Sequence, residues 1–219
     1  LIGMVECKDS ESSSSSGCDS NGEDEGEPVH FSLSDKLKEL FHIYPDEPKN
    51  ELLLLDETRT IEEIITSKNF NCEKHLVKTE DGFNLTIFRI PGPKNCTNPE
   101  KRPPVLFQHG VFDSSDGWLC NGEEKSIPFV LANKGYDIWL SNSRGNKYSK
   151  SHDKYEPDSF EFWQFSFHDM AMYDEPAIIE YINSQNSSGE KIIYFGHSQG
   201  TTLMFCGLSQ NFDFYKKNL

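Results

Sequence analysis

The sequence lacks a long apolar run and is poor in basic residues. It contains no stretch of about 18 apolar residues, the length that predicts a transmembrane helix. Its 219 residues include 21 Lys and Arg against 36 Asp and Glu, a formal net charge of -15. This acidic balance argues against nucleic acid and anionic membranes as partners. The sequence does not specify an oligomeric state.

Cysteines in metal-ligand spacing are also lacking. The six cysteines show no C-x-x-C pattern and no histidine-rich neighbourhood: Cys7, Cys18, Cys72, Cys96, Cys120 and Cys206. Scattered cysteines of this kind are typical of free buried thiols or of one incidental disulfide. We therefore expect no metal site.

Composition divides the chain into two regions. Residues 1–57 form an acidic, Ser-rich extension, and residues 7–28 of it contain almost nothing that a core could bury. We expect this extension to be mostly disordered. The chain does not begin with Met, and residues 1–5 are too short for a whole signal peptide but fit the end of one. The sequence therefore looks cut at the front.

The second region, residues 58–219, alternates between strand and helix signals. Short apolar runs predict buried strands at 104–107, 136–140 and 191–195. Helices are predicted at 126–134 and at about 174–184, the second with Asp174 as its N-cap. Such alternation predicts an α/β fold with a mostly parallel sheet.

Two local signals add detail at the start of this region. Thr60 and Glu63 have the spacing of a capping box that opens a short helix. Residues 74–79 and 83–90 flank Glu80-Asp-Gly82, which predicts a hairpin with a type I′ turn.

A G-x-S-x-G motif follows the last predicted strand. Gly196-His-Ser198-Gln-Gly200 stands between that strand and an apolar segment, residues 201–208, that can form a helix. Strand, motif and helix in this order predict a nucleophile elbow, a turn so tight that the serine hydroxyl is exposed. Glycines two residues before and after the serine let strand and helix approach closely. The motif predicts a serine ester hydrolase with Ser198 as nucleophile.

A second part of such a site follows the strand at 104–107. His109-Gly110 begins the loop that, in this plan, gives one backbone N–H to an oxyanion hole. The other N–H comes from the residue after the nucleophile, Gln199. Two pieces of one site about ninety residues apart strengthen the prediction.

The expected base is missing. A hydrolase of this plan orders its triad as Ser, then Asp or Glu, then His, yet residues 199–219 contain no histidine. His109 and His197 stand at the wrong places in this order, and we expect them to shape loops. Asp213 follows the elbow too closely to be the triad acid, so we expect it on the surface. The chain therefore carries a nucleophile without its base.

Other polar and aromatic features have a functional and a structural interpretation. Three sequons, at Asn84, Asn95 and Asn186, favour glycosylation and the secretory pathway, although Asn84 lies in a predicted strand. We expect Arg144 to tie a turn through buried hydrogen bonds rather than to bind substrate. An aromatic cluster is expected in the core rather than at a lipid surface: Phe160, Phe162, Trp163, Phe165 and Phe167.

Four segments together resemble one family. The sequence is similar to the acid lipases, the gastric, lysosomal and insect-type members of the α/β-hydrolase superfamily, from about Thr58 to the end. The similarity covers roughly the first half of that family's catalytic domain. It rests on residues 107–118 (FQHGVFDSSDGW), 135–146 (GYDIWLSNSRGN), 162–174 (FWQFSFHDMAMYD) and 196–202 (GHSQGTT).

This resemblance implies an α/β-hydrolase fold truncated just after the elbow. It implies Ser198 as nucleophile and the N–H groups of Gln199 and Val111 as oxyanion donors. Relatives usually have leucine in place of Val111, but a backbone donor tolerates either side chain. The implied activity is hydrolysis of neutral lipid esters, triacylglycerols or steryl esters, at a lipid–water interface. No metal or organic cofactor is implied, and the implied location is secreted or lysosomal.

Two hypotheses follow. In the first, the chain is the N-terminal part of a working lipase, and residues 58–219 alone have negligible esterase activity. In the second, it is a complete but truncated lipase-like protein that binds lipid or a protein partner without catalysis. A parallel sheet that stops just after the elbow leaves an apolar strand at an exposed edge, which disfavours the second hypothesis.

Overall fold

The structure is a computed structural model that describes residues 55–219. The predicted extension, residues 1–57, lies almost wholly outside the described residues, and its disorder stays a prediction. The described part is built on one five-stranded sheet, in the order β1-β2-β4-β3-β5. Its strands are β1 (Glu73–Lys78), β2 (Asn84–Ile90), β3 (Pro104–Gln108), β4 (Asp137–Leu140) and β5 (Ile193–Gly196).

The sheet is mixed. β3 pairs in parallel with β4 and with β5, while β2 pairs antiparallel with β1 and with β4. The parallel half confirms the α/β alternation, because each parallel step needs a crossover connection. The antiparallel half comes from the predicted hairpin. The predicted buried strands at 104–107 and 136–140 are confirmed, and every residue of β3 and β4 is buried.

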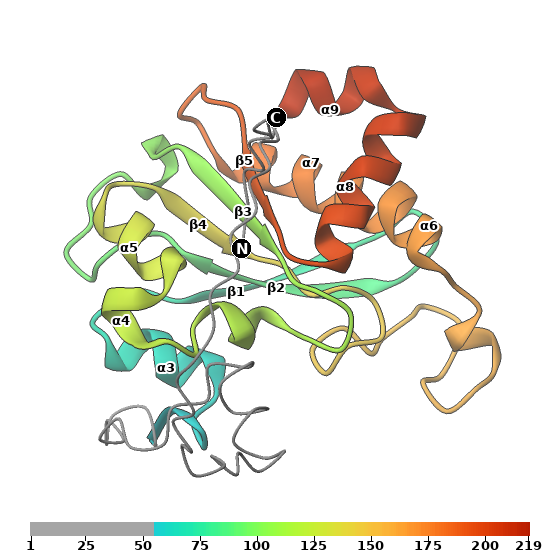
Figure 1. Ribbon diagram of the computed structural model, residues 1–219, viewed down its shortest axis with the longest axis horizontal. Coiled ribbons are helices and arrows are strands. Elements are labelled where there is room, and N and C mark those ends of the chain that lie inside the picture. Colours follow the sequence, from blue (N-terminus) through green and yellow to red (C-terminus); the bar gives the residue numbers. More distant parts are fainter. Residues whose placement is uncertain (1–54) are drawn as a thin grey trace, which may run out of the picture. The chain divides into compact units, whose positions relative to one another are not determined.

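Helices flank the sheet on both faces (Figure 1). They are α3 (Ile61–Ser67), α4 (Gly122–Lys125), α5 (Ile127–Asn133), α6 (Phe167–Asp169), α7 (Glu175–Gln185), α8 (Gln199–Gln210) and α9 (Phe212–Asn218). Shorter 3-10 turns lie at η1 (Pro99–Lys101), η2 (Ser115–Trp118) and η3 (Glu161–Trp163), and a π-helical turn, η4 (Met170–Asp174), joins α6 to α7. The predicted helix at 126–134 is α5, and the capping box at Thr60 and Glu63 opens α3.

Alternating side chains of the strands supply two cores. Val105 and Phe107 of β3 pack with α3 and α5 on one face of the sheet. Leu106 faces the opposite side, where α7, α8 and α9 pack. This period-two alternation is the ordinary consequence of strand geometry. The strand that leads to Ser198 is thus supported by helices on both faces of its sheet.

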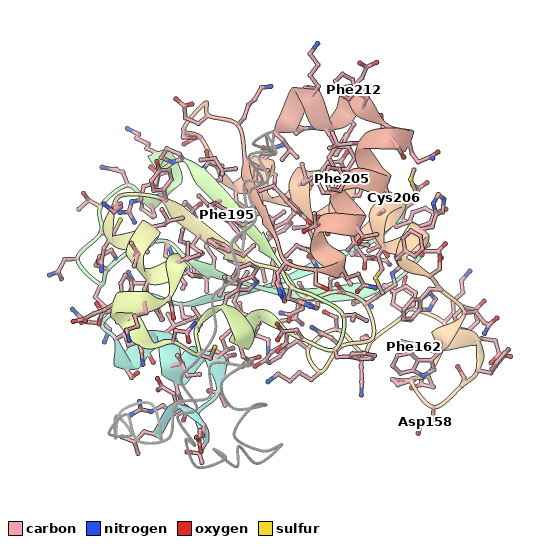
Figure 2. All side chains as sticks on the ribbon, viewed as in Figure 1. Asp158, Phe162, Phe195, Phe205, Cys206 and Phe212 are labelled. Atoms are coloured by element: carbon pink, nitrogen blue, oxygen red, sulfur yellow. The ribbon has the colours of Figure 1, made fainter. Side chains whose placement is uncertain are left out.

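β5 differs from the sequence prediction of a fully buried strand. Among the described strands it pairs with β3 alone, and Ile193 is 44% exposed. The adjoining helices also carry apolar side chains on their outer surfaces: Figure 2 shows Phe205 on α8 and Phe212 on α9, and both are exposed. The prediction of full burial was wrong, because an apolar run looks the same whether its strand lies inside the sheet or at the edge, whereas the exposed edge expected of a sheet that stops after the elbow is present.

Two local predictions were also wrong. Asp174 does not cap α7: its backbone is helical, at φ -69° and ψ -54°, and its carboxylate binds Arg144. The hairpin turn is not type I′, which needs two residues at positive φ, because Gly82 alone among the turn residues has one (φ 102°). Within residues 55–219, no helix combines the length and the apolar character needed to cross a bilayer.

Candidate active site

Ser198 occupies a strained turn between β5 and α8. Its φ of 50° and ψ of -115° lie outside the regions that non-glycine residues ordinarily adopt. The turn holds because the neighbouring glycines permit contacts that no side chain would. A Cβ at Gly196 would lie 2.9 Å from the Thr201 nitrogen, and one at Gly200 would lie 2.5 Å from the Gln108 carbonyl oxygen. The predicted elbow is therefore present, with Ser198 exposed at its tip.

The loop after β3 packs directly against this turn. A Cβ at Gly110 would lie 3.1 Å from the Ser198 Cβ, closer than most Cβ contacts, so glycine eases the approach of the two segments. The next residues, Val111 and Phe112, are exposed, and Phe112 has a positive φ of 59°. Strained non-glycine residues cluster at ligand sites more often than elsewhere. No local sequence pattern predicts the positive φ of Phe112.

The two backbone groups predicted as oxyanion donors are both free. Gln199 is the first residue of α8, a position whose N–H has no intrahelical acceptor. Neither its N–H nor that of Val111 donates a hydrogen bond to any described residue. Gln199 and Val111 follow directly after the two residues in contact, Ser198 and Gly110, so both N–H groups belong to the same small area of the surface.

His109 fixes the loop that carries Val111. Its Nδ1–H donates to the Gly110 carbonyl oxygen at 2.7 Å, and its Nε2 accepts from the Ser143 backbone N–H at 3.1 Å. Asn146 Nδ2 also lies 3.1 Å from Nε2. Burial lowers the pKa of His109, so the ring is neutral. Because both nitrogens are occupied, His109 shapes the loop, as the sequence predicted.

None of the histidines in residues 55–219 is hydrogen-bonded to the Ser198 hydroxyl. The rings of His75, His152 and His168 have hydrogen-bond partners elsewhere. The His197 ring lies edge-on to Trp118, with centroids 6.3 Å apart, and its Nδ1 faces Gly110. Asp213 is exposed at the start of α9, as predicted.

A cavity of about 700 Å³ opens beside the elbow. Gly110, Val111 and Gln199 line it on the side of Ser198. Apolar side chains line another part of it: Phe112, Trp163, Phe165 and Met170. Its polar wall includes Ser143 and Asn146, the partners of His109, which belong to the segment 135–146 that carries part of the family resemblance.

The aromatic cluster divides between core and surface. Phe162 is fully buried and Phe165 is half-buried, as expected for core residues. Phe160, Trp163 and Phe167 are exposed, so the prediction of a core cluster was wrong for these three. Phe160 and Trp163 belong to an irregular segment with one 3-10 turn, which can bury only some of its side chains, and Phe167 begins the three-residue helix α6.

Arg144 ties three segments together, as the sequence predicted. Its guanidinium donates to Asp174 Oδ1 at 2.6 and 2.8 Å and to the Asp81 carboxylate at 2.6 and 2.9 Å. It also stacks 4.1 Å from the centre of the Phe83 ring. The loop after β4, the β1–β2 turn and η4 thus meet at one buried side chain. Burial raises the pKa of Asp174 to about 6, against the lowering effect of Arg144.

The three sequons have different surroundings. Asn95 is exposed, and its side chain makes no hydrogen bond to the described residues. The Asn186 Nδ2 donates to the Arg102 carbonyl at 2.7 Å, and Asn84 lies in β2 with its Nδ2 3.4 Å from Ser151 and Asp153. Of the three side-chain amides, that of Asn95 is therefore the most accessible.

The cysteines and the potential metal ligands of residues 55–219 are scattered. Cys72, Cys96, Cys120 and Cys206 are free thiols, while Cys7 and Cys18 lie outside the described residues. No cluster of three or more His, Cys, Asp or Glu side chains within residues 55–219 is placed to hold a metal ion.

Two family models match the chain. A model described as a partial alpha/beta-hydrolase lipase region matches residues 61–122, and one described as the alpha/beta hydrolase fold matches residues 103–214. The second covers more than half of the chain and includes the elbow and both predicted oxyanion donors.

Known proteins also resemble the chain. Gastric triacylglycerol lipase of Rattus norvegicus is 48% identical over 158 residues, which cover 72% of this chain and 40% of the relative. Lipase member K of Mus musculus is 42% identical over 158 residues, covering 72% and 39%. Among solved structures, an esterase of Pyrococcus furiosus is 20% identical with a TM-score of 0.47, covering 70% of this chain and 51% of that one. The chain thus spans about 40% of the length of the curated relatives it matches.

Proposed function

The chain belongs to the acid lipase family of the α/β hydrolases, and from this premise we propose that it carries the nucleophile and the oxyanion hole of a serine ester hydrolase. The proposed nucleophile is Ser198, and the proposed oxyanion donors are the N–H groups of Val111 and Gln199. The proposed substrates are neutral lipid esters, either triacylglycerols or steryl esters.

The observation that carries the proposal is the strained backbone of Ser198 beside two unused N–H groups. Strain of this kind costs on the order of 1–3 kcal/mol, and it persists only where the surroundings enforce it. Here Gly196 and Gly200 enforce it through contacts that a side chain would prevent, and Gly110 eases the approach of the neighbouring loop. A fold without chemistry to perform at this position would be more stable with a relaxed turn.

The reaction proceeds in two steps. The Ser198 oxygen attacks the ester carbonyl carbon while a general base takes the hydroxyl proton, and the Val111 and Gln199 N–H groups stabilise the negative oxygen that forms. The tetrahedral intermediate expels the alcohol, which receives that proton, and leaves an acyl group on Ser198. Water then attacks the acyl-enzyme and releases the carboxylic acid, which restores the serine.

The general base in this proposal is a histidine, and residues 55–219 place none in that role. Both nitrogens of His109 are occupied, and the ring of His197 contacts Trp118 and Gly110. We therefore expect negligible hydrolysis by residues 58–219 alone, since a triad serine without its base loses several orders of magnitude in rate.

Two features support a lipid ester as substrate and delivery to a secretory or lysosomal compartment. Phe112 and Trp163 form an apolar, solvent-exposed rim on the cavity beside the elbow, which suits an acyl chain at a lipid–water interface. The sequons, Asn95 above all, and the gastric lipase named among the relatives support the secretory route.

The test compares the natural protein with the 219-residue chain. Both would be assayed with a short-chain nitrophenyl ester and with an emulsified triacylglycerol. We expect hydrolysis by the natural protein, loss of it in Ser198→Ala, and none by the isolated chain. If the 219-residue chain hydrolyses the ester robustly and Ser198→Ala abolishes this activity, the proposal that the chain lacks its general base is refuted. Activity of the natural protein that survives Ser198→Ala would refute the assigned nucleophile, and inactivity of the folded natural protein would favour a lipid-binding or partner-binding role.

A further inference from the structure

Beneath the elbow lies a carboxyl group for which the proposed chemistry has no use. Glu175, the first residue of α7, is 0% exposed, and neither of its carboxyl oxygens has a hydrogen-bond partner among the described residues. Buried carboxylates are almost always paired or hydrogen-bonded. A fully buried carboxyl group without a partner therefore needs an explanation.

Two phenols face Glu175, Tyr194 from β5 and Tyr215 from α9. The Tyr194 hydroxyl lies near enough to hydrogen-bond the Glu175 carboxyl group, but it has a single proton and a backbone carbonyl oxygen already accepts it. Tyr194 donates to the Gly200 carbonyl oxygen at 2.9 Å, and Tyr215 donates to the Ala171 carbonyl oxygen at 3.1 Å. On the remaining side stands another buried carboxylate, Asp174.

Charged groups at a greater distance do not stabilise an ionised Glu175. Arg144 directs its guanidinium to Asp174 and Asp81, and the Cys206 thiol lies beyond Tyr215. An ionised Glu175 would therefore be buried next to a like charge without a cation of its own, and it would compete with the Gly200 carbonyl oxygen for the Tyr194 proton. Burial, with the added repulsion of Asp174, raises the pKa of Glu175 from 4.5 to about 8.

We propose that Glu175 is a pH-sensitive switch for the support of the nucleophile elbow. Protonated, the side chain packs as a neutral group between α7, β5 and α9. Ionised, it must reach water, and it can do so only by separating the elements that enclose it. One of its neighbours, Tyr194, holds the Gly200 carbonyl in the first turn of α8. The separation would therefore loosen the turn that strains Ser198.

The direction of the pH effect follows from the two states of the chain. Glu175 binds its proton more tightly in the folded than in the unfolded protein, so folding is favoured below pH 4.5 and loses that advantage as the pH rises to about 8. Between these values, one proton of difference raises the unfolding equilibrium constant about tenfold for each pH unit. Above about pH 8, Glu175 is ionised in both states and no longer makes the free energy of unfolding depend on pH.

The experiment measures urea-induced unfolding of the full chain across this pH range. Glu175→Gln keeps the shape of the protonated acid and cannot ionise. The unfolding equilibrium constant of this variant should therefore lack the roughly tenfold rise per pH unit that Glu175 contributes in the wild type. Glu175→Leu, which removes the polar group, should show the same reduced dependence. Glu180→Gln is the matched control, because Glu180 is an exposed glutamate of the same helix and should leave the wild-type profile unchanged.

A second readout locates the effect. Amide hydrogen exchange, corrected for the intrinsic effect of pH, should show β5 and the first turn of α8 losing protection in the wild type as the pH rises, and keeping it in Glu175→Gln. Parallel stability profiles in the wild type and in both Glu175 variants would overturn the proposal. So would a pH-dependent loss of protection that is identical in Glu175→Gln. Neither readout depends on ester hydrolysis, so the result stands apart from the proposed function.

Discussion

Replacing Arg144 with alanine should destabilise the fold strongly and in a pH-dependent way. The substitution leaves Asp174, only 2% exposed, without its cation and without the two hydrogen bonds from the guanidinium, and it keeps only the bond from the backbone N–H of residue 144. Removing one partner of a buried ion pair costs about 3–5 kcal/mol. Asp81 adds little to this figure, because its side chain is 27% exposed and a pair with solvent access is worth about 0–1 kcal/mol.

The sign of the pH dependence follows from Asp174. Its pKa is already raised to about 6 by burial, and Arg144 is the main group that opposes this rise. Without Arg144 the pKa rises further, so the carboxyl is protonated and tolerated at acidic pH. The loss of stability should therefore be smallest near pH 5 and should grow above pH 6, by about 1.4 kcal/mol for each unit by which the pKa rises.

Urea unfolding of the wild type, Arg144→Ala and Asp81→Asn at about pH 5 and about pH 8 tests this. Asp81→Asn is the matched control, since it removes the exposed partner and leaves Asp174 paired; its cost should stay within about 1 kcal/mol. An Arg144→Ala protein within about 1 kcal/mol of the wild type at the higher pH would refute the buried-pair argument. A large loss that is equal at both pH values would refute the role assigned to Asp174.

Substitutions at Gly200 and Ser198 probe the elbow, and glycan mapping probes the surface. Gly200→Ala places a Cβ 2.5 Å from the Gln108 carbonyl oxygen, so it should cost about 1–3 kcal/mol in urea unfolding, and an unchanged midpoint would contradict the close approach. Ser198→Gly should be more stable than Ser198→Ala by about 1 kcal/mol in thermal denaturation, because glycine adopts φ 50° without strain; equal stabilities would exclude strain. After expression through a secretory pathway, peptide mapping should find a glycan at Asn95 and none at Asn186, whose amide is bound to Arg102; the reverse pattern would show that this bond does not protect it.

The parts of the fold that sequence predicts well are those that local chemistry determines. β3 and β4 are short apolar runs in which every residue is buried, and the elbow needs glycine at two fixed positions. The capping box at Thr60 likewise depends on residues three apart. Each of these signals lies within a few residues of the element it specifies, so no knowledge of the tertiary structure is needed to recognise it.

The failures have the opposite character. Asp174, followed by Glu175 and Pro176, has the sequence of a helix start. However, its carboxylate accepts hydrogen bonds from Arg144, thirty residues earlier in the sequence, and the π-helical turn η4 already includes Asp174. The strain at Phe112 depends on how its loop meets α8 and leaves no mark in the local sequence. The exposure of Phe160 and Trp163 depends on the irregular path of the segment that carries them. In each case a partner distant in sequence, or the path of a loop, decides the outcome.

Asp174 and Glu175 show why such distant partners matter for the chemistry as well as for the fold. The two acids are adjacent in sequence and almost equally buried, but a guanidinium reaches only the first. Asp174 can therefore carry a charge, because it accepts three hydrogen bonds from Arg144, whereas Glu175 must keep its proton or leave the core. The charge below the elbow is thus set by the position of one arginine. Because β5 and α8 pack on the same residues that enclose Glu175, the stability of the Ser198 turn depends on that protonation state.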